Sequence, residues 1–114
     1  MSEIEHLVVL VTAGSEDEAH TIAQALVRSM LAACVNVVPG ITSIYRWQEE
    51  VQEDHEWLLV VKTRRDVLDE VVRQVQALHS YDLPEVIALP LVGGSRDYLR
   101  WLDKGVEGGW HGLD

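Results

Sequence analysis

The order in which short apolar runs alternate with helix-patterned segments is the feature that most limits how this chain can fold. Residues 7–11 and 57–61 are continuously apolar and rich in branched side chains, which is typical of buried strands. Residues 15–31 and 63–78 instead repeat apolar side chains at the spacing of one helix face. The predicted strands cover 6–12, 34–47, 56–63 and 85–92, and the predicted helices start at Ser15, Thr63 and Ser95.

This order, β-α-β-β-α-β followed by a helix, is that of the ferredoxin-like arrangement. The predicted fold class is therefore α+β, with two helices on one face of a four-stranded antiparallel sheet. A chain of 114 residues is the usual length of one domain, here residues 1–114. The glycines near its end predict a loose tail over about 104–114.

Local signals predict where these elements start and stop. Ser15 heads a capping-box pattern, and Thr63 is expected to cap the second helix. The Pro39-Gly40 pair predicts a bulge in the second strand. Residues 48–54 are polar, so we expect them to form the turn of a long antiparallel hairpin over about 41–63.

Charge and cysteine content exclude several classes of protein. Nineteen acidic and nine basic residues give a net charge of −10, which argues against a nucleic-acid partner or an anionic membrane surface. Cys34 is the only cysteine, so an internal disulfide is impossible and a reducing compartment is expected. The sequence has no long apolar span, and its acidic start differs from a signal peptide. These features predict a cytoplasmic protein.

The strands are apolar on both faces. Val8 and Val9 are neighbours in one predicted strand, and Val60 and Val61 are neighbours in another. Because successive side chains of a strand point to opposite faces, the helices can cover only one of these two surfaces. An uncovered apolar sheet face on a monomer would be adhesive. We therefore expect an oligomer that buries the second face.

Several stretches of the chain resemble one known family. They are 32–40 together with 43–47, 59–63, 78–90 and 98–102. In this order they resemble the CutA family of divalent-cation tolerance proteins, over about residues 7–103. The resemblance implies a ferredoxin-like subunit in a tight homotrimer, joined through strands and the long hairpin. It also implies a role in tolerance to divalent metals, chiefly copper.

Two positions depart from the pattern of that family. The hairpin tip is Gln48-Glu49-Glu50-Val51, where relatives commonly carry Gly-Lys, so the tip is acidic and its turn lacks a glycine. Ser80 follows His79, where the family usually has proline. Ser80 keeps a backbone N–H that proline would lack, and we expect the loop to be more mobile.

A group of potential metal ligands lies where the second helix meets the last strand. It comprises His79, Tyr81, Asp82 and Glu85. Imidazole and carboxylate groups suit copper(II) or zinc(II), although the spacing matches no established metal motif. The proposed copper ligands are His79 and Glu85, with Cys34 as a third ligand across a subunit boundary. The alternative is structural: a histidine at a helix end, a polar residue at a strand start, and a small buried cysteine.

A second group of residues predicts a pocket or interface between subunits. Tyr45 and Trp47 lie on one face of a strand, where they could line a ligand pocket or anchor a neighbouring subunit. Lys62 and Thr63 could hold an anion at a helix N-terminus, or Lys62 could form a structural ion pair. Tyr81 is assigned to the same pocket or interface.

Two functions follow from these residues. The first is a homotrimer that binds divalent metal, preferably copper, in divalent-cation tolerance. The alternative is a trimeric module that resembles the PII-type signalling proteins and binds a small ligand without a physiological metal. That second resemblance concerns architecture alone. Since the sequence carries neither a nucleophile elbow nor a glycine-rich phosphate loop, we do not expect an enzyme.

Overall fold

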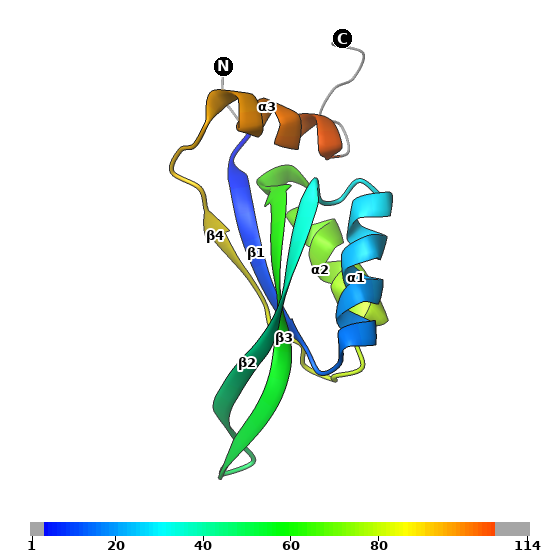
Figure 1. Cartoon of the computed structure of the whole chain (residues 1–114), viewed down its shortest axis with the longest axis vertical. Helices are drawn as coiled ribbons and strands as arrows, with labels where there is room; N and C mark the ends of the chain where they lie inside the picture. The colour runs from blue at the N-terminus through cyan, green and yellow to red at the C-terminus, as the bar shows by residue number, and fades with distance from the viewer. Residues whose placement is uncertain (1–3, 107–114) are drawn as a thin grey trace.

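The predicted α+β order is confirmed by the computed structural model, which describes residues 4–106 (Figure 1). Four antiparallel strands form one sheet in the order β2-β3-β1-β4. The strands are β1 (His6–Ala13), β2 (Cys34–Trp47), β3 (Glu50–Arg64) and β4 (Val86–Pro90). The helices are α1 (Glu16–Arg28), the 3-10 turn η1 (Arg65–Val67), α2 (Leu68–Leu78) and α3 (Arg96–Gly105).

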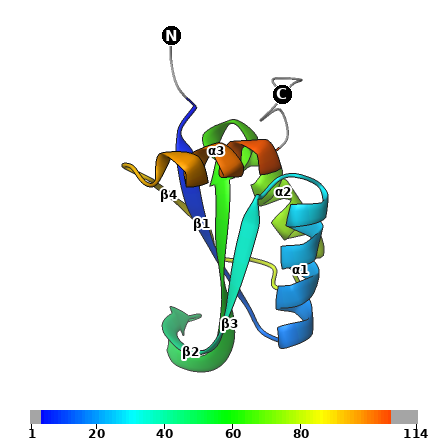
Figure 2. The ribbon, with the colours of Figure 1, turned by 45° about the horizontal axis from the view of Figure 1, so that its top comes forward.

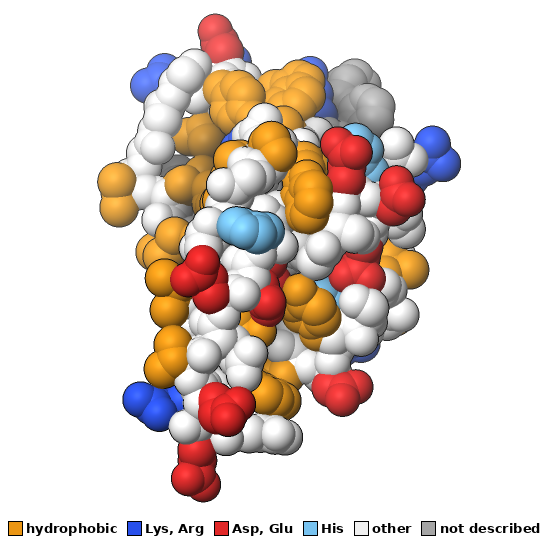
Figure 3. All heavy atoms as spheres, turned by 60° about the horizontal axis from the view of Figure 1, so that its bottom comes forward, with side chains coloured by type: hydrophobic (Ala, Val, Ile, Leu, Met, Phe, Trp, Pro, Cys, Tyr) orange, Lys and Arg blue, Asp and Glu red, His pale blue; other side chains and the backbone are white. Residues whose placement is uncertain are grey.

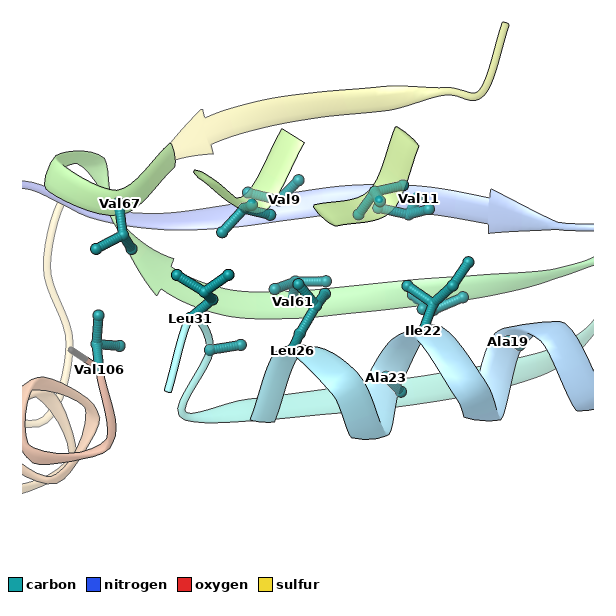
Figure 4. Close-up of a cluster of buried hydrophobic side chains, with 14 of the residues drawn as sticks. Val9, Val11, Ala19, Ile22, Ala23, Leu26, Leu31, Val61, Val67 and Val106 are labelled. Atoms are coloured by element: carbon teal, nitrogen blue, oxygen red, sulfur yellow. The ribbon is translucent and has the colours of Figure 1, made fainter. Parts of the chain in front are cut away.

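The core lies between one face of the sheet and the helices α1 and α2 (Figures 1 and 2). Alternate residues of the two central strands, such as Val9, Val11 and Val61, are fully buried against this helical layer. Ile22 and Leu26 of α1 point into the same cluster (Figure 4). Burying a side chain of this size contributes about 1.5–3 kcal/mol, so the buried side chains of this layer together favour folding of the single chain.

The helix starts only partly match the predictions. Ser15 caps α1, because its hydroxyl accepts a hydrogen bond from the Glu18 N–H at 3.1 Å. Thr63 does not cap the second helix, since β3 continues to Arg64 and a 3-10 turn comes before α2. The Thr63 hydroxyl is buried and donates to the Leu31 carbonyl at 2.7 Å. It therefore ties β3 to the loop after α1.

The C-terminal segment is more ordered than its glycines predict. Helix α3 is capped by Ser95 and crosses the end of the sheet at which β2 begins (Figure 1). It continues through Gly105, and Val106 is fully buried. Residues 104–106, which we expected in a loose tail, are thus part of the packed domain. The remainder of that predicted tail, 107–114, lies outside the described residues.

The hairpin of β2 and β3 is longer, and its turn is tighter, than predicted. A shift in register between Val38 and Ile41 confirms the bulge at 39–40. Strand β3 starts at Glu50, so the predicted turn over 48–54 is wrong and only Gln48 and Glu49 form it. The polar residues that suggested a turn are strand residues in the part of the hairpin that extends beyond the helices (Figure 1). Without a core to face, they need not be apolar.

The opposite face of the sheet is apolar and uncovered by the helical layer. Val8 and Leu10 of β1 lie across from Leu89 and Ile87 of β4, and Leu10 also lies across from Val60 of β3. These residues alternate with the buried ones, so they point away from α1 and α2. Ile87 and Leu89 are 52% and 51% exposed in the single chain. We call this surface, made of Val8, Leu10, Val60, Ile87 and Leu89, the open face.

The hairpin turn predicts a measurable gain from glycine. Gln48 and Glu49 have φ angles of 50° and 70°, in the left-handed region that costs non-glycine residues about 1–2 kcal/mol each. We expect Glu49→Gly to raise the free energy of unfolding by about 1 kcal/mol, measured by urea titration. The control is Glu53→Gly in the same hairpin, an exposed strand position where glycine should destabilise. Equal effects of the two variants would contradict this account of the turn.

Candidate ligand-binding groove

A groove of about 610 Å³ opens between the hairpin and the loop that joins α2 to β4. Its walls come from β2, β3, the end of β1 and residues 81–85 of the loop. The lining residues are Thr12, Ser43, Ile44, Tyr45, Trp47, Asp54, Glu56, Tyr81, Asp82, Leu83 and Glu85. Figure 3, viewed from the hairpin end, shows acidic and hydrophobic side chains close together on this part of the molecule.

Strand register brings the hairpin residues of the groove together. Ser43 pairs with Asp54, and Ile41 pairs with Glu56, so the two carboxylates lie on the same side of the hairpin. Tyr45 and Trp47 follow Ser43 at alternate positions and therefore share that side. A two-residue turn at 48–49 is what sets this register. The predicted turn over 48–54 included Asp54, so the sequence did not predict that Asp54 and Glu56 lie beside Tyr45 and Trp47.

Asp54 and Glu56, the two hairpin carboxylates that line the groove, each accept a hydrogen bond from a tyrosine. Tyr81 Oη donates to Glu56 Oε2 at 2.8 Å, and Tyr45 Oη donates to Asp54 Oδ2. Burial, followed by the bond to Glu56, raises the pKa of Tyr81 far above its usual range. The bond to Asp54 is the main cause that raises the pKa of Tyr45. Glu56 is only 5% exposed, so this acidic group lies in the wall of the groove.

Gly14 makes room for the Tyr81 ring. A Cβ at position 14 would lie 2.7 Å from Tyr81 Oη and 3.4 Å from its ring carbons. Any larger residue would push the ring away from Glu56. Gly14, which follows β1, therefore allows Tyr81 of the α2–β4 loop to pack closely against the backbone.

His79 holds the loop that carries Tyr81. Its side chain is fully buried, and Nδ1 accepts a hydrogen bond from the Tyr81 N–H at 3.1 Å. Because that nitrogen accepts, Nε2 carries the proton and donates to the Thr12 carbonyl at 2.7 Å. The imidazole and phenol rings also pack with centroids 4.6 Å apart. Both ring nitrogens are thus engaged in fixing the loop to the end of β1.

Ser80 ties the same loop to helix α1. Its backbone N–H and its hydroxyl each donate to the Glu18 carboxylate at 3.1 Å. Proline at this position could provide neither bond. The mobility that we expected from replacing proline is therefore opposed by two hydrogen bonds.

The three predicted metal ligands do not meet within one chain. Glu85 lines the groove, whereas His79 is buried beside it with both nitrogens engaged. Cys34 lies in the same row of the sheet as Lys62 and Val8, with which Lys62 pairs. His79 contacts Thr12, which is four residues further along β1 than Val8. That separation is about 13 Å along the strand. Within residues 4–106, no group of three or more His, Cys, Asp or Glu side chains is placed to hold a metal ion.

The predicted pocket residues divide into two places. Tyr45, Trp47 and Tyr81 line the groove. Lys62 and Thr63 lie at the other end of β3, where Lys62 Nζ donates to Asn36 Oδ1 and is 3.9 Å from Cys34 Sγ. These contacts replace the predicted anion site at a helix N-terminus, because β3 rather than a helix contains both residues.

The fold is shared with known proteins over nearly all of the described residues. The family described as "CutA1 divalent ion tolerance protein" matches residues 7–105. This chain belongs to that family. The match covers every strand and helix described above except the first residue of β1. The resemblance found in the sequence is thereby confirmed.

Individual CutA relatives agree over most of the domain. A "Divalent-cation tolerance protein CutA" of Thermus thermophilus is 58% identical over 95 residues, which are 83% of this chain and 92% of that protein. A solved structure of a divalent cation tolerance protein from the same species superposes with a TM-score of 0.87 at 54% identity, covering 89% and 98% of the two chains. The CutA1 structure from Oryza sativa gives 0.88 at 46% identity, covering 90% and 94%.

No helix within residues 4–106 is both long and apolar enough to cross a membrane. Relatives are described in different compartments. The Arabidopsis thaliana protein is named chloroplastic, and the Archaeoglobus fulgidus structure is titled periplasmic.

The tyrosine environments of this CutA protein predict its behaviour at alkaline pH. All three tyrosines have a pKa above the usual value of 10 in the folded chain. Since the folded pKa is raised, the stability from these phenols is present below about pH 10 and is lost as pH rises through the folded values. In an ultraviolet titration at about pH 10 we expect less phenolate in the folded protein than in the urea-unfolded protein, whose phenols are about half ionised there.

Gly14→Ala tests the packing of Tyr81 in the same titration. We expect one tyrosine to ionise at lower pH than in the wild type, because the added methyl displaces the ring from Glu56. Gly94→Ala is the control, since its Cβ would meet only ordinary contacts at 3.7 Å or beyond. An unchanged titration curve for Gly14→Ala would contradict the role of Gly14.

Proposed function

We propose that this chain acts in divalent-cation tolerance as a homotrimer that binds divalent cations, copper(II) among them, in the groove. The observation that supports this is the charge of the lining. Asp54, Glu56, Asp82 and Glu85 contribute four carboxylates, and the lining residues include no lysine, arginine or histidine. Such a surface concentrates cations. The family description supports a role in divalent-cation tolerance, and the carboxylates of the groove support cation binding as the chemistry.

Copper(II) accepts both carboxylate and imidazole ligands, which decides how the predicted ligands contribute. Glu85 is exposed in the groove and is the ligand that we retain from the sequence. His79 would have to release its bond to the Tyr81 N–H or to the Thr12 carbonyl before it could bind a metal. Cys34 could take part only from a neighbouring subunit. Residues 4–106 of one chain hold no complete metal centre, so in this proposal water or a second subunit supplies the remaining ligands.

The open face supports the proposed homotrimer. It presents branched apolar side chains on both central strands and on β4, and a surface of this kind is usually covered in a stable protein. A closed ring of three identical subunits buries the same surface on each copy. The groove lies beside this face, so residues of a second subunit can complete it.

Light scattering on the purified full chain tests the assembly. We expect three times the 12.8 kDa chain mass for wild type and a smaller mass for Ile87→Lys, because a charge on the open face opposes burial. Val27→Lys is the matched control, since Val27 is 41% exposed but lies on α1. A monomeric wild type would overturn the proposal.

Native mass spectrometry with copper(II) tests the metal. We expect saturable uptake that Glu85→Gln reduces at least tenfold in affinity, while Glu16→Gln, an acidic residue in the first turn of α1, leaves it unchanged. His79→Ala should alter uptake only to the extent that the loop collapses, which far-ultraviolet circular dichroism and thermal melting would reveal. Uptake that ignores Glu85 would contradict a groove site.

The size of the groove favours a second candidate function. About 610 Å³ is far more than one ion occupies, and Ile44, Trp47 and Leu83 give it apolar walls. A small organic ligand would use this space, as in the PII-like alternative. In either case we propose a non-catalytic role in the cytoplasm, without nucleic-acid or membrane partners.

A further inference from the structure

The groove combines negative charge with partly apolar walls, and these two properties together favour one class of organic ligand. Every titratable residue of its lining is an acid or a tyrosine. The remaining lining is aliphatic, aromatic or hydroxylic. A ligand that satisfies both parts has a positive head and a carbon chain.

Glu56 is the carboxylate of the groove that we assign to the positive group of the ligand. The side chain is only 5% exposed, and Tyr81 is the donor that the structure places on it, at 2.8 Å. A carboxylate has about four acceptor positions, so one phenol leaves most of them for another donor. Burying a carboxylate without further compensation is costly, which favours a cationic donor beside it. A primary ammonium group offers three N–H donors and a full charge.

The aromatic residues favour an organic cation over a bare metal ion. In the single chain Tyr45 and Trp47 are 41% and 47% exposed, and both line the groove together with Tyr81. Aromatic faces attract ammonium groups by cation–π interaction, worth about 0.5–2 kcal/mol. A metal ion in the groove would need water or a second subunit to complete its ligand shell, because residues 4–106 hold no group of three or more ligands, whereas an ammonium ion needs no such shell. Leu83, which is 74% exposed, adds apolar surface for a carbon chain.

We infer that the groove binds a primary alkylammonium ion, with the ammonium at Glu56 and the carbon chain along Trp47 and Leu83. This rests on the second candidate function, a small-ligand site in the groove, and names its ligand. Copper and the alkylammonium ion are titrated separately, so either proposal can fail while the other stands.

Isothermal titration of the full chain with pentylamine tests the inference, with pentan-1-ol and pentanoate as probes of equal chain length. We expect one saturable pentylamine site per chain, at least tenfold tighter than the alcohol, and no binding of the acid. Glu56→Gln should weaken pentylamine at least tenfold. Glu53→Gln is the matched control, because it removes the same charge from the same strand but points to the other side.

Equal affinity for amine and alcohol, or equal loss in Glu53→Gln, would overturn the inference. If Glu56→Gln does not fold, Trp47→Ala at the exposed hairpin carries the test and should weaken pentylamine by at least threefold. Copper uptake without pentylamine binding would overturn the alkylammonium site and leave the metal proposal standing. Pentylamine binding without copper uptake would overturn the metal proposal and leave the alkylammonium site standing.

Discussion

The pairing of β1 with β3 is the constraint on which the rest of the structure depends. These two central strands are apolar on both faces, so two surfaces must be covered. The helices α1 and α2 cover one of them and form the core (Figure 4). The open face then requires a second layer, and other copies of the chain are the cover that we propose. In that proposal, the fold and the assembly both follow from the pairing of β1 with β3.

The groove depends on a second, more local chain of contacts. His79 fixes the loop to the end of β1, the loop carries Tyr81, and Gly14 leaves space for its ring. Tyr81 then donates a hydrogen bond to Glu56 on β3, the strand paired with β1. His79, which the sequence suggested as a metal ligand, therefore positions Tyr81, the residue that contacts Glu56. Because both of its ring nitrogens form hydrogen bonds, His79 cannot bind a metal without local rearrangement.

The sequence predicted what depends on periodicity and missed what depends on register. Apolar spacing placed the strands and helices, and the cap at Ser15 needs only three residues of sequence. Thr63 was misjudged because its hydroxyl serves a distant carbonyl, of Leu31, instead of the next helix. The aromatic residues of the groove could be grouped from the sequence, but Asp54 and Glu56 joined them only once the turn was placed at 48–49. Long-range pairing of this kind leaves no local signal.

The acidic groove beside the hairpin is, in our proposal, where this CutA protein binds cations. A crystal structure grown with copper(II), with anomalous diffraction recorded at the copper edge, tests this most directly. We predict an anomalous peak within the groove, in contact with Glu85 or another of its carboxylates. Copper peaks found only elsewhere on the protein, with the groove filled by water, would contradict it.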